Sequence, residues 1–474
     1  MITVIGGGPA GIAAALAAAR TGESVRIIEG SSRLGGQYWR HLPEDLYLQD
    51  GEEYLRGQRL RQKVSRHPNI EILFNTHLWH ANSDENQITL NIVQRGNARM
   101  LTSDALILAT GAYDRSLPFP GWDIPGVMTA GAAQSLLKGS DVRAGNQVVI
   151  AGTGPFLLPV ASGLLDAGVE VVGLFEANRI SRWVPFAHVG LANISKVALA
   201  IKYMKSFKTH GLKMEHGQVV LRANAGSDGL LHSITVTKVD RNFQAKMGSE
   251  REIICDALAI TWGFTPDVSV ASNLGLKLTI DTHDGSTTVV VDEHQQTSLR
   301  RVFAAGEITG IGGSELAMTE GEIAGISAAH FLDPSGNAKD EPHIKRLLKM
   351  RKSQRNFARA LLSVYKVRPG WTDRLTPETV ICRCEEVSLT DIQDAVHKLG
   401  ATNSRSTKLF CRAGMGMCQG RTCLRSVSEI VAKESGVEAK HRDQFSSGYR
   451  PIIFPISLDS VANALSVEDS HHNH

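Results

Sequence analysis

The sequence predicts an α/β protein that combines two dinucleotide-binding units with a small C-terminal domain. Two glycine-rich turns, at residues 6–11 and 152–155, each follow a short apolar strand and precede a helix. Five of the six cysteines are crowded between residues 382 and 423. A chain of 474 residues has room for about two to four domains, so these features can belong to separate domains.

The first unit is a Rossmann-like βαβ element at the start of the chain. Gly6 suits a tight turn, Gly8 lets the backbone approach a pyrophosphate, and Gly11 lets the helix pack close to the strand. The positive end of the helix dipole then faces the phosphates. Glu29 ends the second strand, where a carboxylate can accept hydrogen bonds from an adenosine ribose. We therefore expect dinucleotide contacts from Gly6, Gly8, Pro9, Ala10, Gly11 and Glu29.

A second, imperfect copy of this element begins at residue 147. Its third glycine position holds Leu157, which keeps the helix farther from the strand and reshapes the pyrophosphate seat. The sequence leaves three states open for this site, namely NAD, ATP or a retained scaffold without a nucleotide. The expected contacts are Gly152, Gly154, Pro155 and Glu176.

Two further apolar strands, at residues 105–112 and 257–263, each end in small residues and follow one of the βαβ elements. Their placement indicates a duplicated architecture, with Thr110 and Gly111 at the end of the first strand. Near residue 302 another short strand delivers Gly306 and Glu307. In a flavin site such an acid can accept hydrogen bonds from the ribityl chain.

In this order, the elements resemble the glutathione-reductase-type flavoprotein superfamily over residues 1 to about 335. The resemblance implies an FAD-binding domain that is interrupted by an NAD-type domain. Glu307 departs from the aspartate that is usual at this place, although a longer acid can still reach the ribityl hydroxyls. No Cys-x-x-Cys pair occurs in the chain, so disulfide reduction is disfavoured.

Two segments, 35–40 and 117–122, narrow the likeness. They resemble the larger subunits of hetero-oligomeric amino-acid dehydrogenases and oxidases, a group with opine oxidases, hydrogen cyanide synthase and dye-linked proline and hydroxyproline dehydrogenases. The resemblance implies FAD contacts at Gly36 and Gln37 and a β-type FAD-dependent partner subunit that oxidises the amino or imino acid. It also leaves room for a small third subunit, an FMN at a subunit interface and peripheral association with a membrane.

The clustered cysteines indicate a metal centre and not disulfides. Their spacing, Cys-x-Cys and Cys-x4-Cys, favours a [2Fe-2S] cluster over a structural zinc site, since zinc sites usually pair Cys-x2-Cys knuckles. The region resembles bacterioferritin-associated ferredoxin domains. By that resemblance the ligands are Cys382, Cys384, Cys418 and Cys423, and Cys411 is surplus, although spacing alone leaves open which two of the three later cysteines bind.

The predicted fold class is therefore α/β, with an NAD-type Rossmann-like domain inserted in an FAD domain and a small helical C-terminal [2Fe-2S] domain. We expect the following boundaries: FAD domain 1–118 and 290–335, NAD-type domain 119–289, helical linker 336–377, [2Fe-2S] domain 378–440 and C-terminal tail 441–474.

Charge and composition exclude some partners. With 51 basic and 48 acidic residues, the balance gives no reason to expect nucleic acid. No apolar run approaches the ~20 residues of a membrane span. A buried strand starting at residue 2 leaves no room for a targeting peptide, so we expect a cytoplasmic protein. Lys205, Lys208 and Lys213 are interpreted as a solvated face.

Taken together, these features favour an electron-transfer flavoprotein subunit that passes electrons from substrate-reduced flavin to an acceptor. No general base or nucleophile is singled out, so no catalytic residue is predicted. The alternative is an NADH-dependent flavoprotein reductase of a carrier protein, in which Glu176 would favour NADH over NADPH.

Overall fold

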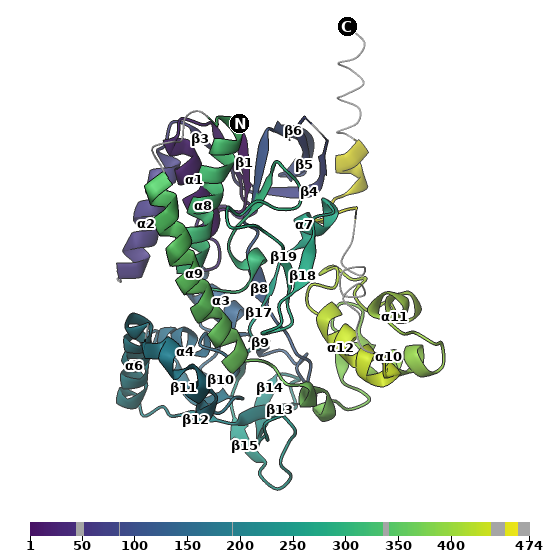
Figure 1. Cartoon of the computed structure of the whole chain (residues 1–474). Coiled ribbons are helices and arrows are strands. Elements are labelled where there is room, and N and C mark those ends of the chain that lie inside the picture. The colour runs from purple at the N-terminus through teal and green to yellow at the C-terminus, as the bar shows by residue number, and fades with distance from the viewer. Residues whose placement is uncertain (44–51, 85, 192, 335–340, 438–450, 463–474) are drawn as a thin grey trace. The chain divides into compact units, whose positions relative to one another are not determined.

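The computed structural model describes residues 1–43, 52–84, 86–191, 193–334, 341–437 and 451–462 (Figure 1). The chain forms two compact units. Unit 1 comprises residues 1–113, 266–358 and 448–474, and unit 2 comprises residues 114–265 and 359–447.

Unit 1 is built on a five-stranded parallel sheet. Its strand order is β20 (Val302–Ala304), β7 (Ala105–Leu108), β1 (Ile2–Ile5), β2 (Val25–Ile28) and β3 (Ile70–Leu73). Strands β1 and β7 are buried along their whole length, because a parallel sheet is covered on both faces and therefore needs continuous apolar runs. The predicted βαβ element at the N-terminus is confirmed.

Two helices of unit 1, α1 (Pro9–Arg20) and α8 (Ser314–Leu332), lie side by side (Figure 1). Their backbones approach so closely that a Cβ atom added to Gly321 would lie 2.1 Å from the carbonyl oxygen of Ala10, and one added to Gly325 would lie 2.3 Å from that of Ala14. Small residues on both helices therefore set the distance between them.

The remainder of unit 1 surrounds this sheet. It includes an antiparallel sheet of β4 (Thr76–Ser83), β5 (Ile88–Gln94) and β6 (Asn97–Ser103), and the elements α2 (Glu52–Ser65), α7 (Ser269–Asn273), β18 (Leu278–Ile280), β19 (Thr287–Val289) and η3 (Glu307–Thr309). Helix α9 (Glu341–Val364) begins in unit 1 and ends in unit 2.

The domain boundaries stay a prediction, and the compact units divide the chain at other places. The first segment of unit 1 ends at residue 113, and unit 1 includes residues 266–289 of the expected NAD-type domain. The reason is packing, because Val270, Leu276 and Val289 are buried in the same core as Ile88 and Leu90. These contacts join segments far apart in the sequence, which a local pattern does not reveal.

Unit 2 contains a second parallel sheet with the order β12 (Met214–His216), β11 (Glu170–Glu176), β10 (Gln147–Gly152), β16 (Ala257–Thr261) and β9 (Val127–Thr129). The other elements of this part are α3 (Ala130–Ser140), α4 (Leu157–Asp166), η2 (Ile180–Phe186), α5 (Ala187–Leu191), α6 (Ile194–Thr209) and the antiparallel strands β13 (Gln218–Ala225), β14 (Leu231–Lys238) and β15 (Arg251–Ile254). The predicted duplication is thus visible as two parallel sheets.

The cysteine-rich region also belongs to unit 2. It consists of η4 (Pro369–Arg374), the short hairpin β21 (Val380–Cys382) and β22 (Val387–Ser388), and the helices α10 (Leu389–His397), α11 (Ser404–Cys411) and α12 (Leu424–Ser435) (Figure 1). A capping box between Ser388 and Asp391 starts α10. In the described residues, no helix is both long enough and apolar enough to cross a membrane.

The close contact of α1 with α8 predicts opposite outcomes for two glycine substitutions. Gly325→Ala forces a methyl group against the backbone of α1 and is expected to lower the free energy of unfolding by about 1–3 kcal/mol. Gly163→Ala, in the middle of α4, meets only Leu137 at 3.8 Å and is expected to stabilise the protein by about 0.5–1 kcal/mol. Denaturant unfolding of both variants measures this difference, and equal midpoints would contradict the packing described.

Candidate functional site

The first glycine turn has the backbone geometry that a dinucleotide needs. Gly6 has a φ of +103°, and a Cβ atom there would lie 2.4 Å from the carbonyl oxygen of Ala109. Helix α1 starts after Gly8 with Pro9 in its first turn, and no side chain caps it. The backbone N–H groups at this end of α1 are thus placed as in helix N-termini that bind phosphate.

A second loop meets this turn. The N–H of Gly35 donates to the carbonyl oxygen of Gly7 at 2.8 Å, and a Cβ atom on Gly36 would lie 2.9 Å from the Cα atom of Gly8. The structure therefore brings Gly36, and Gln37 after it, next to the glycine turn. Only a residue without a side chain permits this approach.

The predicted ribose ligand Glu29 is hydrogen-bonded to the loops around it. Its side chain is 9% exposed. One carboxylate oxygen accepts a hydrogen bond from the N–H of Gly7 at 2.7 Å, and the other accepts from the N–H of Ser31 at 2.8 Å. A carboxylate has about four acceptor positions, so Glu29 can hold the loop and still accept from a ribose hydroxyl.

The turn after β7 is also tied in place within unit 1. The hydroxyl of Thr110 donates to the carbonyl oxygen of Asp267 at 2.6 Å, and the N–H of Asp267 donates to the carbonyl oxygen of Gly111 at 2.9 Å. Gly111 has a φ of +74°. The two predicted residues thus form a short, fixed connection at the carboxyl end of the sheet, where ligands of open α/β sheets bind.

Glu307 is folded back onto the glycine loop that follows it. Its two carboxylate oxygens accept hydrogen bonds from the N–H groups of Gly312, at 3.0 Å, and Gly313, at 2.7 Å. Burial raises the pKa of the Glu307 carboxyl above its usual range. The extra methylene relative to aspartate is what lets this side chain reach the start of α8.

A buried ionic network lies beneath this loop and was not predicted from the sequence. Glu320 on α8 is fully buried and forms ion pairs with Arg351, at 3.2 Å, and with Arg355. Glu320 also accepts hydrogen bonds from the N–H of Gly306 and the hydroxyl of Thr309. A sequence signal existed, because Glu320 is an acid among small residues and the two arginines are four positions apart on α9.

The second glycine turn is hydrogen-bonded to its own acidic residue. Glu176 is fully buried, and its carboxylate accepts hydrogen bonds from the Thr153 hydroxyl and from the N–H groups of Gly154 and Asn178. Burial raises the pKa of Glu176 to about 7. In the alternative function, an NADH-dependent reductase, Glu176 would favour NADH over NADPH, and this preference stays a prediction.

Leu157 occupies the third glycine position of this turn. It is fully buried and lies in the core between the sheet of unit 2 and α4. Gly152 and Gly154 keep φ values of +126° and +114°, so the turn itself is retained although the third glycine is lost. Pro155 follows this turn and is exposed.

Four cysteine thiols meet in the C-terminal part of unit 2. The thiol of Cys423 is hydrogen-bonded to those of Cys382 and Cys418, and Cys418 also contacts Cys384. The hydrogen bond with Cys423 lowers the pKa of the Cys382 thiol and of the Cys418 thiol. The same two hydrogen bonds raise the pKa of the Cys423 thiol. Thiolates are the form that binds metals, so the site favours the ligand form of two cysteines.

Two glycines lie close to these cysteines. The N–H of Gly414 approaches the sulfur of Cys382 at 3.4 Å, and a Cβ atom on Gly416 would lie 2.3 Å from the Cβ atom of Cys384. Among the described residues, no group of three or more histidines, cysteines and acids is arranged to hold a metal ion. Four thiols that contact one another in pairs are nonetheless the donor set of a two-iron cluster, in which each iron takes two protein ligands.

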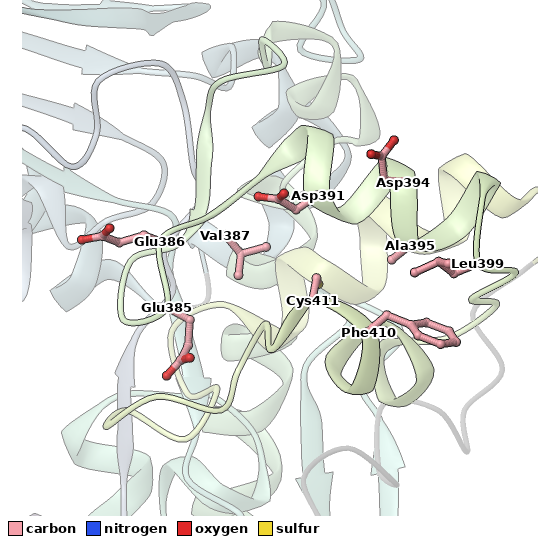
Figure 2. Close-up of a pocket in the computed structure, with 9 residues that line it drawn as sticks. All are labelled: Glu385, Glu386, Val387, Asp391, Asp394, Ala395, Leu399, Phe410 and Cys411. Atoms are coloured by element: carbon pink, nitrogen blue, oxygen red, sulfur yellow. The ribbon is translucent and has the colours of Figure 1, made fainter.

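The thiol of Cys411 is hydrogen-bonded within its own helix and not to another of these thiols. Its thiol donates to the carbonyl oxygen of Thr407 at 3.2 Å, within α11, and burial raises its pKa. Together with Phe410 it lines a cavity of about 350 Å³ against α10 and the β21–β22 turn (Figure 2). Four carboxylates line the same cavity, from Glu385, Glu386, Asp391 and Asp394, so the cavity that Cys411 lines is acidic.

These two sites define the class of protein. A parallel sheet with a flavin-type glycine turn, and four converging cysteines on the same chain, are the features of an oxidoreductase that combines FAD with an iron–sulfur domain. Residues 1–330 match the family model described as pyridine nucleotide-disulphide oxidoreductase, and the chain belongs to this family. Residues 380–433 match the BFD-like [2Fe-2S] binding domain. These matches support FAD and a [2Fe-2S] cluster as the redox groups.

The sequences of two named proteins are similar to this chain over more than nine-tenths of its length. An opine oxidase subunit from Agrobacterium tumefaciens is 31% identical over 98% of this chain and 91% of its own length. Hydrogen cyanide synthase subunit HcnB from Pseudomonas protegens is 32% identical over 91% of this chain and 92% of its own length. Among solved structures, L-proline dehydrogenase from P. horikoshii aligns with a TM-score of 0.69 and 21% identity, over 97% of this chain and 78% of that one.

The comparisons confirm the resemblance, the fold class and the assignment as an FAD-dependent oxidoreductase. The relatives are named as subunits, so this chain is similar to parts of larger enzymes. The residues proposed to touch each cofactor stay predictions. They lie on four loops of unit 1 and at the end of β2, on one turn of unit 2 and in one group of thiols.

The ionic network under the Gly306 loop yields a prediction. Glu320→Gln leaves two partly buried arginines without their counter-charge and is expected to lower the free energy of unfolding by about 3 kcal/mol. The control, Glu322→Gln, lies two residues away on α8 and removes pairs with Arg20 and His343, of which Arg20 is largely exposed. It is expected to cost no more than about 1 kcal/mol. Urea unfolding would contradict the network's role if both variants lost equal stability.

Proposed function

We propose that this chain is the FAD- and [2Fe-2S]-bearing electron-transfer subunit of a hetero-oligomeric dehydrogenase or oxidase. Its substrate would be an amino or imino acid of the opine, proline, hydroxyproline or glycine type. The observation that carries the proposal is the presence, on one chain, of a flavin-type glycine turn and four cysteine thiols that contact one another in pairs.

The proposed FAD contacts lie on four loops of unit 1. The N-terminal end of α1 and the turn at Gly6 would face the pyrophosphate, and Glu29 would accept from the ribose. The loops at residues 36–37, 110–111 and 306–307 would position the rest of the cofactor. When bound, FAD accepts two electrons together and releases them singly, and a [2Fe-2S] cluster carries one electron at a time.

The proposed cluster ligands are Cys382, Cys384, Cys418 and Cys423. Two of them, Cys382 and Cys423, are buried, whereas Cys384 is exposed. Met417, which directly precedes Cys418, is 83% exposed. One edge of the site is therefore near the protein surface, which supports exchange of electrons with another protein or a small acceptor.

Relatives that are subunits support a partner of the β type, itself an FAD-dependent amino-acid oxidase or dehydrogenase. Oxidation of the C–N bond would then take place on that partner, and no catalytic acid or base is assigned to this chain. A small third subunit and an FMN at the subunit interface belong to the same proposal. For the second glycine turn we propose an adenine nucleotide, with NAD and ATP as the two ligands to compare.

Reduction of the flavin distinguishes this function from an NADH-dependent reductase. The purified chain is mixed with NADH in a stopped-flow instrument, and separately with its co-purified partner chain and a panel of opines, proline, hydroxyproline and glycine. We expect the flavin absorbance to stay unchanged with NADH alone and to bleach when partner and substrate are both present. Rapid bleaching by NADH without a partner would overturn the proposal.

Single cysteine substitutions test the ligand set. Changing any one of the four proposed ligands to serine is expected to abolish the visible absorption and the EPR signal of the reduced cluster. Cys411→Ser is the matched control, because its thiol donates to the carbonyl oxygen of Thr407 within α11, and it should retain both signals. Loss of the cluster in Cys411→Ser, with retention in Cys418→Ser or Cys423→Ser, would assign the ligands differently.

A further inference from the structure

Residues 451–462, the described part of the expected C-terminal tail, are packed on unit 1, and we call them the C-terminal segment. Unit 1 includes this segment, whereas residues 359–447 belong to unit 2. Ile453 is buried in a core with residues of β4 and β5. Farther along the segment, the hydroxyl of the buried Ser460 donates a hydrogen bond to the carbonyl oxygen of Gly96 at 2.7 Å. The C-terminal segment is therefore a part of the fold of unit 1.

The C-terminal segment is hydrogen-bonded to β4, the edge strand of the sheet formed by β4, β5 and β6 (Figure 1). The register of β4 against β5 shifts at Trp79, so this residue has no partner of its own in the ladder. Its carbonyl oxygen accepts a hydrogen bond from the N–H of Ile453 at 2.7 Å. The carbonyl oxygen of Pro451 lies 2.8 Å from the ring nitrogen Nδ1 of His80 and 3.1 Å from the side-chain amide nitrogen of Asn273. The segment thus covers part of the edge of this sheet.

Phe454, which follows Ile453, stacks on His77 at the start of β4. The ring centroids are 4.0 Å apart and the ring planes differ by 1°. Both side chains are half-buried, and burial lowers the pKa of the His77 imidazole. The ring is therefore mostly neutral at pH 7, and the stack requires no burial of a charge. Stacked aromatic pairs contribute stability beyond the apolar area that they bury, so Phe454 holds the His77 ring in place.

The His77 ring also lies against Gly30, in the loop at residues 29–31. A Cβ atom added to Gly30 would lie 2.8 Å from Cε1 and 3.1 Å from Nδ1 of His77. The carbonyl oxygens of Glu29 and Ser31 accept hydrogen bonds at 3.0 Å from the N–H groups of the two residues that precede His77. The start of β4 therefore holds this loop through two backbone hydrogen bonds and one side-chain contact.

This loop carries Glu29, the acid proposed above as the ligand of the FAD ribose. The N–H groups of Gly7 and Ser31 fix the direction of the Glu29 carboxylate, so a shift of the loop would turn it. We propose that Phe454 is a positioning residue for FAD. It holds the His77 ring against the loop and thereby fixes Glu29 for the adenosine half of the cofactor. This role rests on the FAD contacts proposed above.

Ligands that share only part of FAD distinguish positioning from a general effect on stability. The adenosine half is present in FAD and in ADP but absent from FMN. A loosened loop at residues 29–31 should therefore weaken the binding of FAD and ADP and leave that of FMN unchanged. A segment that only stabilised the fold of unit 1 would affect all three ligands alike.

Release of FAD from the full chain, purified with its bound cofactors, is the first test. The chain is diluted, and the rise of free-flavin fluorescence gives the dissociation rate. Phe454→Ala should release FAD about threefold to tenfold faster than the parent, a change that corresponds to the loss of one stacked aromatic pair. Phe454→Tyr keeps the ring and should release FAD at the parent's rate. The matched control is Leu458→Ala, in the same segment but 88% exposed, and it should also match the parent.

A second variant tests the route through His77. His77→Ala should speed FAD release by about the same factor as Phe454→Ala, because either change removes the stack. The double variant should release FAD no faster than the single ones, since two residues that act through one contact are not additive. Flavin-free protein of each variant is then titrated with FAD and FMN by flavin fluorescence, and with ADP by competition against FAD. Thermal unfolding shows which variants are folded, and if Phe454→Ala does not fold, His77→Ala serves for the same comparison.

Three results would overturn this role of Phe454. The first is FAD release from Phe454→Ala and His77→Ala at the parent's rate. The second is an equal loss of FAD and FMN binding, which would make the effect a general one on stability. The third is a Leu458→Ala variant that releases FAD as fast as Phe454→Ala. A parent chain purified without flavin would overturn the function proposed above as well, whereas a flavin-bearing parent with unaffected variants overturns only the positioning role.

Discussion

The cysteine loops are held in place by a core that they share with the second parallel sheet of the same unit. Trp122 is buried in that core, and its indole N–H donates to the carbonyl oxygen of Val380, two residues before Cys382, the first proposed ligand. Trp371 is also buried and donates to Glu429 on α12 at 2.8 Å. Trp122 therefore joins the start of the first cysteine loop to this core, and Trp371 joins η4 to α12.

This arrangement has a physical advantage. A domain of about sixty residues buries little apolar surface by itself and commonly needs a metal or disulfides for stability. Here residues of β21, α10 and α12 lie in one apolar cluster with residues of the second sheet. Arg115 adds an ion pair to Glu429 at 2.8 Å, and Arg374 donates to the carbonyl oxygen of Val220. The thiols can thus be held close together by packing as well as by metal.

Local patterns were sufficient to predict much of the fold. The first βαβ element could be predicted because its glycine spacing follows from backbone sterics, and Gly11 indeed leaves only 1.9 Å between an added Cβ atom and the carbonyl oxygen of Gly6. The position of α10 could be predicted from its apolar periodicity. The gathering of the cysteines could be expected because metal ligands concentrate in short loops.

What escaped prediction depends on contacts between distant segments or on the direction of a side chain. Glu320 meets its arginines across 31 and 35 residues. Glu176 and Glu307 each turn toward their own glycine loops, which a position at the end of a strand does not determine. Phe207 occupies the buried side of α6 and leaves other apolar residues of this helix exposed. The sequence of α6 does not show which apolar residues are buried.

Two redox groups bound to one polypeptide are the central claim, and the most direct measurement is chemical analysis of the chain purified without oxygen. Flavin, iron, zinc and acid-labile sulfide are determined on the same sample. We predict FAD together with equal amounts of iron and sulfide and no stoichiometric zinc. Zinc in place of iron and sulfide, or protein without flavin, would contradict the claim.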